Sequence, residues 1–277
     1  MDFKSCKIHL PICLSYLTFH HKPKTMKRLF AFFSAAVLAA CILSCGKKPG
    51  ETVSSATPNT LTDEEKSAGW ELLFDGSTLN GWKRYGSDTI GPLWSVTEGV
   101  IRCTNEGLND STGQWNGSLM TLKQYGNFEL SVEWKITPGG NSGIIYHVVE
   151  KPEFSTDYAT GPEYQVMDDA GWKGDALKDA QKVGSNYDMY PAPDTKKVMP
   201  VGEWNVSKII YKDGHVGHWL NGEKTVEFQE GDADYQERYK KSKWVDFPGW
   251  NTFKVGSISL QDHGAPVFYR SIKIRPL

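Results

Sequence analysis

The chain of 277 residues has little cysteine and no excess of charge of either sign. Four of its five cysteines fall within the first 45 residues, which leaves Cys103 alone in the remainder. One cysteine cannot form an intramolecular disulfide. Because Cys103 ends the alternating sequence 100–103, we expect a small buried side chain rather than a reactive thiol. The net charge of −2 and the pI near 6.4 provide no basic surface for nucleic acid, so no nucleic-acid partner is expected.

Long apolar runs and familiar catalytic motifs are also missing. After the first fifty residues, no apolar run approaches the length that spans a membrane. The sequence contains no H-E-x-x-H, Cys-x-x-Cys or calcium-loop pattern, and no Gly-x-Ser-x-Gly elbow. These absences argue against common zinc and calcium sites and against a Ser-His-Asp hydrolase.

The N-terminal region has the pattern of a bacterial export signal. Met26-Lys27-Arg28 is a short basic start, residues 29–43 are apolar, and 42–46 resemble a lipobox around Cys45. We therefore expect residues 1–25 to precede the true start, 26–45 to be a lipoprotein signal peptide, and 46–62 to be a flexible tether. Cys45 would carry the lipid, which is the only membrane contact expected. Lys47 and Lys48 follow without an acidic run, which favours the periplasmic face of a membrane.

Residues 63–277 have the pattern of a single all-β domain. Residues 128–136 alternate apolar and polar side chains, as a half-buried strand does. Asp213-Gly214 and Asn221-Gly222 are hairpin turn signals between short strand patterns. More than ten such short strands predict an antiparallel β-sandwich of two packed sheets. A barrel or propeller is an alternative, although no blade repeat is visible.

One predicted strand, at residues 163–169, carries unusual polar side chains. Glu163 and Gln165 share one face of the extended segment, and Tyr164 and Val166 share the other. The apolar face suits a core. The polar face is either exposed to solvent or forms the floor of a cleft. The long irregular stretch from 171 to 200 is of the kind that often lines a site.

Three polar clusters interrupt the strand patterns. They are Asn141-Ser142-Gly143 with His147, then Glu163, Gln165, Asp168 and Asp169, and finally Gln261-Asp262-His263-Gly264 with Arg270. Each has an ordinary alternative: Asn141 can supply a turn, His147 can lie at a rim, and Arg270 can pair with a surface carboxylate. A divalent metal is a further option, because Asp262, His263, His147 and Glu163 offer mixed oxygen and nitrogen ligands.

Several motifs together resemble one known family. They are the segments 70–82 (WELLFDGSTLNGW), 140–144 (GNSGI), 163–168 (EYQVMD), 202–205 (GEWN), 218–222 (HWLNG) and 260–264 (LQDHG), the last leading to Tyr269-Arg270. In this combination and order they are similar to the 3-keto-disaccharide hydrolase family, over about residues 70–276. The resemblance implies a concanavalin A-like jelly-roll sandwich of the lectin and glucanase type. It also implies a lipoprotein of the kind found in Bacteroidetes. His147 stands where many members have an arginine.

The resemblance implies cleavage of 3-keto-disaccharides and related 3-keto-glycosides. A ketone at C3 acidifies the C2 proton, so a base can form an enolate that expels the glycosidic oxygen from C1, and water then adds to the enone. On this hypothesis Glu163 or His263 is the base, and Asp262 orients His263. Asp168 or His147 assists departure of the leaving group. Asn141, Gln165 or a bound metal polarises the ketone. Further substrate contacts are expected from Tyr187, Gln261, Arg270 and Trp172.

Two other functions fit the same residues. Glu163, Gln165 and Asp168 partly resemble the catalytic strand of jelly-roll endoglucanases, and a conventional retaining glycosidase would hold two carboxyl groups about 5–5.5 Å apart. A non-catalytic carbohydrate-binding module would instead use Trp115, Trp172 or Trp250 as stacking platforms. The enzymatic hypothesis requires that residues near 147, 163 and 263 converge in one groove.

Overall fold

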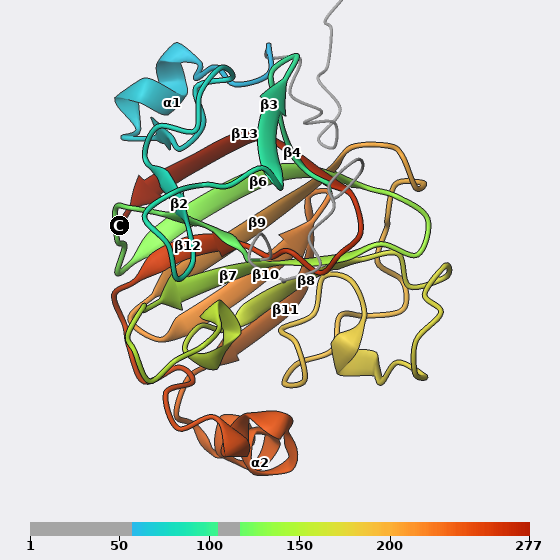
Figure 1. The fold of residues 1–277 in the computed structure, drawn as a ribbon. Helices are drawn as coiled ribbons and strands as arrows, with labels where there is room; N and C mark the ends of the chain where they lie inside the picture. Colours follow the sequence, from blue (N-terminus) through green and yellow to red (C-terminus); the bar gives the residue numbers. More distant parts are fainter. Residues whose placement is uncertain (1–56, 105–116) are drawn as a thin grey trace, which may run out of the picture. The chain divides into compact units, whose positions relative to one another are not determined.

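Two antiparallel sheets form the domain in the computed structural model, which describes residues 57–104 and 117–277 (Figure 1). The eight-stranded sheet runs β11-β10-β9-β6-β13-β4-β3, with β1 also paired to β13. Its strands are β1 (Glu71–Leu72), β3 (Trp94–Thr97), β4 (Val100–Cys103), β6 (Phe128–Ile136), β9 (Asn205–Lys212), β10 (His215–Leu220), β11 (Glu223–Gln229) and β13 (Val267–Pro276). The five-stranded sheet runs β2-β5-β12-β7-β8. Its strands are β2 (Trp82–Arg84), β5 (Leu119–Thr121), β7 (Asn141–Val148), β8 (Glu163–Met167) and β12 (Ser257–Leu260). The predicted all-β jelly-roll sandwich is confirmed.

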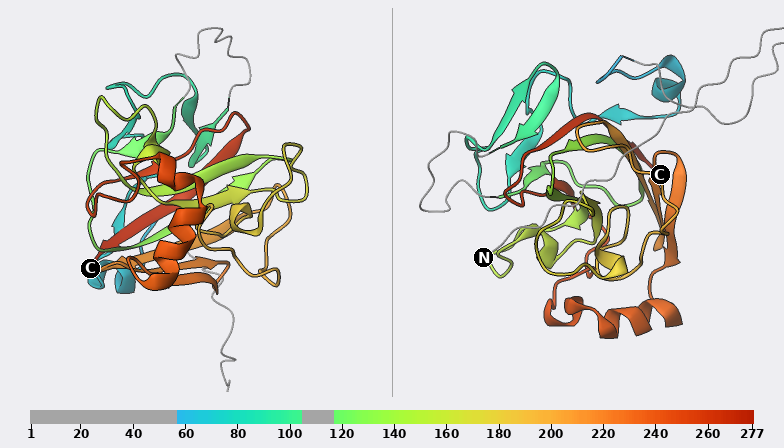
Figure 2. Two further views of the ribbon diagram at one scale, coloured as in Figure 1. Left: turned by 90° about the horizontal axis from the view of Figure 1, so that it is seen from below. Right: turned by 90° about the vertical axis from the view of Figure 1, so that its right-hand side faces the viewer.

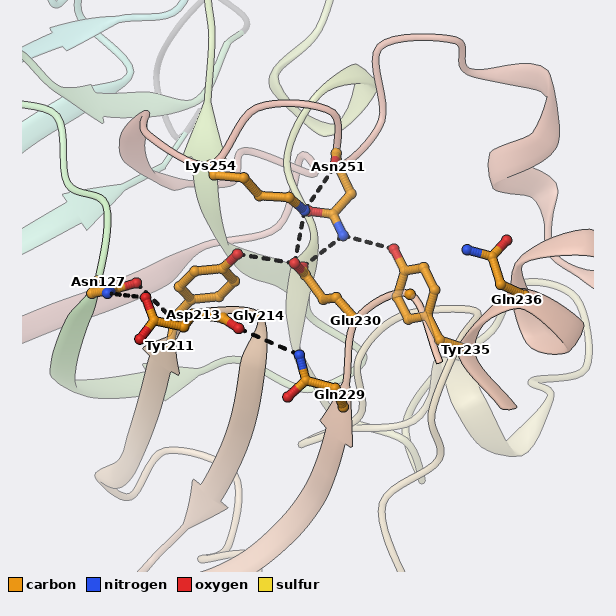
Figure 3. A pocket seen from close by; sticks show the side chains of 11 residues that line it. Asn127, Tyr211, Asp213, Gly214, Gln229, Glu230, Tyr235, Gln236, Asn251 and Lys254 are labelled. Atoms are coloured by element: carbon orange, nitrogen blue, oxygen red, sulfur yellow. Dashed lines mark hydrogen bonds and ion pairs between the residues drawn. The ribbon is translucent and has the colours of Figure 1, made fainter. Parts of the chain in front are cut away.

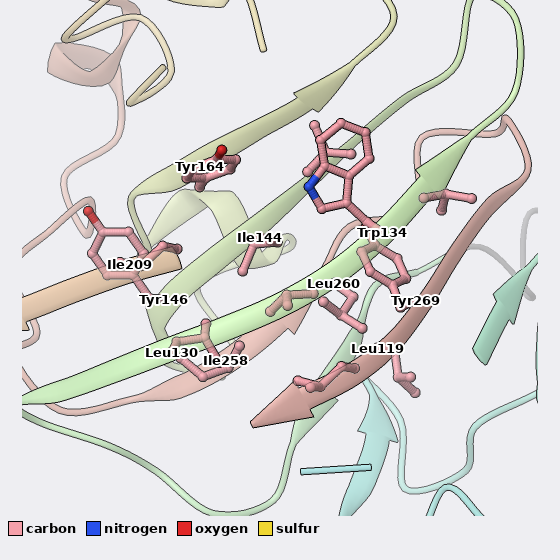
Figure 4. Packing of buried hydrophobic residues seen from close by; sticks show 14 of the residues in the cluster. Leu119, Leu130, Trp134, Ile144, Tyr146, Tyr164, Ile209, Ile258, Leu260 and Tyr269 are labelled. Atoms are coloured by element: carbon pink, nitrogen blue, oxygen red, sulfur yellow. The ribbon is translucent and has the colours of Figure 1, made fainter. Parts of the chain in front are cut away.

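The strand patterns in the sequence place the core between the sheets. The alternate residues 128, 130, 132, 134 and 136 of β6 are all buried, while the residues between them are partly exposed. Figure 4 shows Trp134 of β6 and Tyr269 of β13 packing with Ile144, Tyr164 and Leu260 of the facing sheet. The indole of Trp134 donates a hydrogen bond of 2.7 Å to the Ser207 hydroxyl, so its one polar atom is satisfied inside the core.

Two of the predicted hairpins have the expected turn chemistry. Asp213 and Gly214 both have positive φ, 50° and 79°, and Asn221 and Gly222 have 49° and 85°. This left-handed pair is what a two-residue type I′ turn requires, and the Asx-Gly sequence tolerates it at low cost. The turns join β9 to β10 and β10 to β11.

The helices are short and lie at the margins. They are α1 (Asp63–Ser67), α2 (Ala233–Lys241) and the 3-10 turns η1 (Asp157–Ala159), η2 (Asp179–Gln181) and η3 (Lys243–Asp246). Thr62 caps α1 in a capping box with Glu65. The helix α2 follows β11 and lies beside that edge of the sandwich, where Tyr235 stacks on Phe228 (Figures 1 and 2). None of the helices among the described residues is long and apolar enough to cross a membrane.

The boundary of the predicted tether needs correction. Asn59 donates from its side chain to the Gly99 carbonyl at 2.8 Å and accepts from the Ser271 backbone at 2.7 Å. Residues 59–62 are therefore docked on the sandwich, and the folded domain begins before residue 63. The predicted signal peptide, the lipidated Cys45 and Trp115 lie outside the described residues.

Candidate active site

The outer face of the five-stranded sheet brings together four of the predicted site residues. Gly143 pairs with Gln165 on β8, and its carbonyl accepts a hydrogen bond of 2.9 Å from the Gln261 backbone after β12. One row along, Ile145 pairs with Glu163. Asn141 lies on the same face, opposite Met167. Their strand neighbours Ile144, Tyr164 and Val166 point into the core, so alternation directs the polar set to the other face.

Glu163 is the most unusual carboxyl group of this face. The residue is 4% exposed, and its side chain accepts no hydrogen bond from any residue that the structure describes. A Cβ atom built on Gly143 would lie 2.4 Å from Oε1 of Glu163, so the carboxyl group lies directly over this glycine. Burial raises its pKa from 4.5 to about 8; Lys243 opposes this rise and Asp157 adds to it. The pKa of Glu163 therefore lies near neutral pH, where a general acid or base works best.

Lys243 is a functional candidate that the sequence analysis missed. It begins η3, where its backbone N–H donates to the Asp188 carboxylate at 2.8 Å. Its Nζ atom lies 4.4 Å from the ring centroids of both Tyr187 and Trp244 and 5.5 Å from that of Tyr158. The residue is exposed, yet partial desolvation of its ammonium group against these rings lowers its pKa, and the charge of Glu163 opposes this effect. In the sequence, Lys243 is one of several basic residues between 235 and 243, and nothing distinguishes it from its neighbours.

Three side-chain amides surround Gly143. The side-chain oxygens of Asn141, Gln165 and Gln261 are buried and have no hydrogen-bond partner among residues 57–104 and 117–277. The orientation of Gln165 is fixed because its Nε2 donates to the Gln181 carbonyl at 3.1 Å. Buried polar atoms without partners are uncommon in native proteins and call for an explanation. Here they identify a polar floor beside the Glu163 carboxyl group.

A cleft of about 490 Å³ lies at the β12 side of this face. It is lined by Tyr85, Gly117, Ser118, Ser155, Thr156, Asp157, Tyr158, Gln261, Asp262, His263 and Gly264. His263 is exposed there, and its ring lies edge-on to Trp172 with 6.1 Å between centroids. The long loop therefore places Trp172 beside His263, which lines the cleft. Tyr158 connects the two halves of the site, because it lines the cleft and also contacts Lys243.

Asp157 is the second residue of the site that the sequence analysis missed. It is buried, and its carboxylate accepts a hydrogen bond of 2.6 Å from the hydroxyl of Ser259 on β12. Burial raises its pKa, although hydrogen bonds from Ser259 and Ser118 oppose this. It begins the 3-10 turn η1, which has no strand periodicity, so no pattern in the sequence singles it out.

Two of the predicted catalytic carboxylates hold the backbone instead. Asp168 accepts hydrogen bonds from the backbone N–H groups of Gly139 at 2.8 Å and Gly171 at 3.1 Å. Asp262 lines the cleft, but it accepts from Gly117 and Gly264 and makes no hydrogen bond with His263 within the described part of the chain. The expectation that Asp262 orients His263 is therefore wrong, and the Asp168 carboxylate is occupied in a turn.

His147 does not join the groove. A β-bulge interrupts the pairing of β7 with β12, and His147 takes a φ of 57° there. This turns its ring into the space between the sheets, fully buried, 4.3 Å from the ring of Tyr211. Its Nε2 contacts the Gly126 carbonyl at 2.9 Å. Glu163 and the segment that leads to His263 both flank Gly143 on the outer face. The expectation that His147 joins them is wrong, because the bulge reverses its direction.

Arg270 also lies away from the site. It belongs to β13 of the other sheet, pairs with Glu133 at 2.7 Å and lies 4.0 Å from the ring centroid of Trp204. Arg270 therefore forms a surface ion pair, which was the ordinary alternative for it.

Trp250 is not available as a stacking platform, since it is buried against Trp244 with 4.9 Å between the ring centroids. Tyr187 does reach the site, where its ring contacts Lys243 and its hydroxyl lies 3.2 Å from Gln181 Nε2.

The four candidate metal ligands do not assemble. His147 points into the core, whereas Glu163 and His263 lie on the outer face. Among the residues that the structure describes, no group of three or more His, Cys, Asp or Glu side chains is arranged to hold an ion. The residues present therefore do not fit the predicted metal set.

A second hollow, of about 560 Å³, lies at the β9–β10 turn and next to α2 (Figure 3). Two carboxylates line it. Asp213 accepts a hydrogen bond from Asn127 at 2.7 Å, and Glu230 accepts from Tyr211 at 2.9 Å, Asn251 at 2.7 Å and Lys254 at 2.7 Å. Because these charged groups are already satisfied, the hollow lacks the unpaired chemistry of the Glu163 site. The network instead ties the segment around α2 to the sandwich.

Comparisons with known proteins agree with the resemblance in the sequence. A family model described as a 3-keto-alpha-glucoside-1,2-lyase-like domain matches residues 69–275. A 3-keto-disaccharide hydrolase of Bacteroides thetaiotaomicron is 31% identical over 291 residues, covering 91% of this chain and all of the relative.

Solved structures extend the comparison to the fold. The crystal structure of a putative glycosyl hydrolase from Parabacteroides distasonis shares 41% identity, with a TM-score of 0.73, over 80% of this chain and 100% of that chain. A second putative glycosyl hydrolase from the same species shares 25% identity, with a TM-score of 0.56, over 75% and 99% of the two chains. The chain belongs to the 3-keto-alpha-glucoside-1,2-lyase-like family, in which it is similar along nearly its whole length to a 3-keto-disaccharide hydrolase.

Proposed function

We propose that the protein cleaves 3-keto-glycosides, including 3-keto-disaccharides, by elimination followed by hydration. The observation that carries the proposal is the Glu163 carboxyl group, which is buried, lacks a hydrogen-bond partner among the described residues and has a pKa raised to about 8. Membership of the family and the activity named for the Bacteroides relative support a keto sugar as the substrate. Carbohydrate is then the partner of this outer face.

In the proposed reaction Glu163 takes the C2 proton. The C3 ketone makes this proton acidic, because the electron pair left on C2 delocalises onto the C3 oxygen. Collapse of the enolate forms the C1–C2 double bond and breaks the bond from C1 to the glycosidic oxygen, which leaves with a proton as an alcohol. Water then adds its hydroxyl to C1 and a proton returns to C2, which yields a 3-keto sugar. A base whose pKa lies near neutrality is matched to this step.

Other residues of the face supply binding and proton transfer. The amides of Asn141, Gln165 and Gln261 can exchange hydrogen bonds with sugar hydroxyl groups, which would satisfy the oxygens that have no partner in the described chain. His263 is exposed in the cleft and can donate the proton to the leaving oxygen. Trp172 and Tyr158 offer aromatic faces for the sugar rings.

The test compares a 3-keto-glucoside with the same unoxidised glucoside, in heavy water. Elimination and hydration predict cleavage of the keto sugar alone, with deuterium at C2 of the product at early times and in excess of an enzyme-free control. Cleavage with the C2 hydrogen retained would indicate an oxocarbenium mechanism and overturn the proposal. Turnover of the unoxidised glucoside would indicate a conventional glycosidase. Binding of either sugar without turnover would indicate a carbohydrate-binding module.

A further inference from the structure

We propose that Lys243 is a further catalytic residue, whose ammonium group stabilises the negative charge that develops on the C3 oxygen when Glu163 removes the C2 proton. The inference rests on the proposed function. It gives Lys243 the role of polarising the C3 ketone, which the sequence analysis assigned to an amide or to a metal ion. Its basis is the position of a cation that has no ion-pair partner among the described residues, close to the segment that carries the proposed base.

The first observation is that Lys243 lies against the segment that pairs with Glu163, without forming an ion pair with Glu163 itself. Its Nζ atom lies 4.4 Å from the ring centroid of Tyr187, and the Tyr187 N–H donates to the Glu163 carbonyl at 3.0 Å. Each of the two charges also favours the charged form of the other group. No ion pair joins them within 4.0 Å, and no other carboxylate among the described residues pairs with Lys243. A buried carboxyl and a nearby ammonium would ordinarily close into a direct contact. Here they lie more than 4.0 Å apart, so neither charge is neutralised by a direct contact with the other.

The second observation is that Lys243 is held in position. The indole of Trp244 donates to the Tyr187 carbonyl at 2.9 Å, and Trp244 stacks on Trp250 at 4.9 Å. Ser242 caps the same turn by accepting from the Trp244 N–H at 3.2 Å. The backbone that carries Lys243 is therefore anchored on both sides, and its side chain extends along aromatic rings. A cation prepared in this way needs little reorganisation when charge develops nearby.

The chemistry favours a cation over the neutral amides. Removal of the C2 proton converts a neutral ketone into an enolate with a full negative charge on oxygen. Asn141 and Gln165 offer only neutral dipoles, whereas Lys243 carries a charge that is unpaired within the described part of the chain. The C2 and C3 atoms are bonded, so a base at C2 places the C3 oxygen close to that base. A cation near Glu163 is therefore suitably placed for that oxygen.

The alternative is that Lys243 only packs. A lysine over aromatic rings can contribute to stability through cation–π contacts alone. That role predicts a lower melting temperature when Lys243 is replaced, with each folded molecule retaining its activity. A catalytic role predicts the opposite result: proton abstraction at C2 is lost, while the melting temperature changes little.

The experiment isolates proton abstraction from cleavage. A 3-keto sugar that lacks a leaving group at C1 is incubated with the full-length protein in heavy water, and exchange at C2 is followed by NMR. The variants are Lys243→Met, Lys243→Gln and Lys243→Arg. Lys241→Met is the matched control, because Lys241 lies two residues earlier and is exposed as Lys243 is, but it pairs with Glu237. Melting temperatures are measured for every variant, and a second neutral replacement covers the event that one of them unfolds.

We expect both neutral variants to lower C2 exchange and kcat by about 10²–10³-fold, with KM changed only a few-fold. Lys243→Arg should recover part of the exchange and Lys241→Met should match the unaltered protein. Exchange within threefold of the unaltered protein in a folded neutral variant would overturn the inference. A reduced amine adduct on Lys243 after borohydride treatment would also overturn it, because Lys243 would then act through a covalent iminium. Loss of exchange in the unaltered protein itself would refute the proposed function instead.

Discussion

Replacement of Glu163 by glutamine tests the central physical claim, that its carboxyl group is desolvated without compensation. Glu163→Gln keeps the size and shape of the side chain, but it can neither ionise nor accept a proton. The carboxyl group lies over Gly143 and accepts no hydrogen bond within the described residues, so the substitution breaks no contact there. Its effects should therefore come from the charge alone.

The expected size follows from the pKa of Glu163. An increase from 4.5 in the unfolded chain to about 8 in the folded protein means that the folded state binds the proton more tightly. The free energy of unfolding is thus highest below pH 4.5 and falls as the pH rises through 8, by about 5 kcal/mol once the group is fully ionised. Between pH 5 and pH 8 the loss amounts to about 3 kcal/mol. The glutamine variant cannot ionise at this position, so its free energy of unfolding does not fall in this way.

The assay is urea denaturation of both proteins at pH 5 and pH 8, with Glu203→Gln at an exposed position as the control. The stability advantage of Glu163→Gln should be about 3 kcal/mol larger at pH 8 than at pH 5, whereas the control should show no such change. In parallel, kcat/KM of the unaltered protein for a 3-keto-glucoside should increase with pH to a plateau above about 8, and the variant should lose about 10²–10⁴-fold. A difference below about 1 kcal/mol would show that the carboxyl group is not desolvated.

Four further predictions concern single residues. Gly143→Ala should lower kcat/KM by at least about 10²-fold, because the new methyl group would overlap Cγ, Cδ and Oε1 of Glu163 and displace its carboxyl group. Arg270→Gln should leave activity within about twofold and cost about 1 kcal/mol or less in urea denaturation, since its ion pair lies on the other sheet. His263→Gln should slow cleavage of poor alkoxide leaving groups far more than that of activated aryl groups, as product assays would show. Because residues 42–46 predict lipidation at Cys45, Cys45→Ala should move the expressed protein from the membrane fraction to the soluble fraction.

The fold was largely predictable because its strands are marked locally. The 128–136 alternation and the two Asx-Gly hairpins needed no information beyond a few neighbouring residues, and the structure places them as expected. The strand β8 was predicted with its two faces correctly divided between core and polar side chains. That its polar side is buried was not decided by the sequence, because the cover comes from distant loops.

The site was predictable only where residues lie on paired strands. Asn141, Glu163 and Gln165 belong to neighbouring strands whose register follows from the sheet. His147 belongs to the same strand, but a bulge turns it inward, and a bulge is set by tertiary pairing. Lys243 reaches the site from a 3-10 turn, which has no periodicity that would predict its direction.

Burial without hydrogen bonds from the described residues suits the Glu163 carboxyl group to catalysis, but it also lowers the stability of the fold when the group ionises. A carboxylate that accepted hydrogen bonds here would be stable and weakly basic, with a low pKa and little tendency to take a proton from carbon. Leaving Glu163 over Gly143, with Lys243 held at a distance, keeps its pKa near 8 at a loss of stability that increases with pH. If a more stable Glu163→Gln protein is also inactive, the site has exchanged stability for reactivity in the way expected of functional positions. If the variant gains stability and retains activity, the buried charge serves some purpose other than proton transfer at C2.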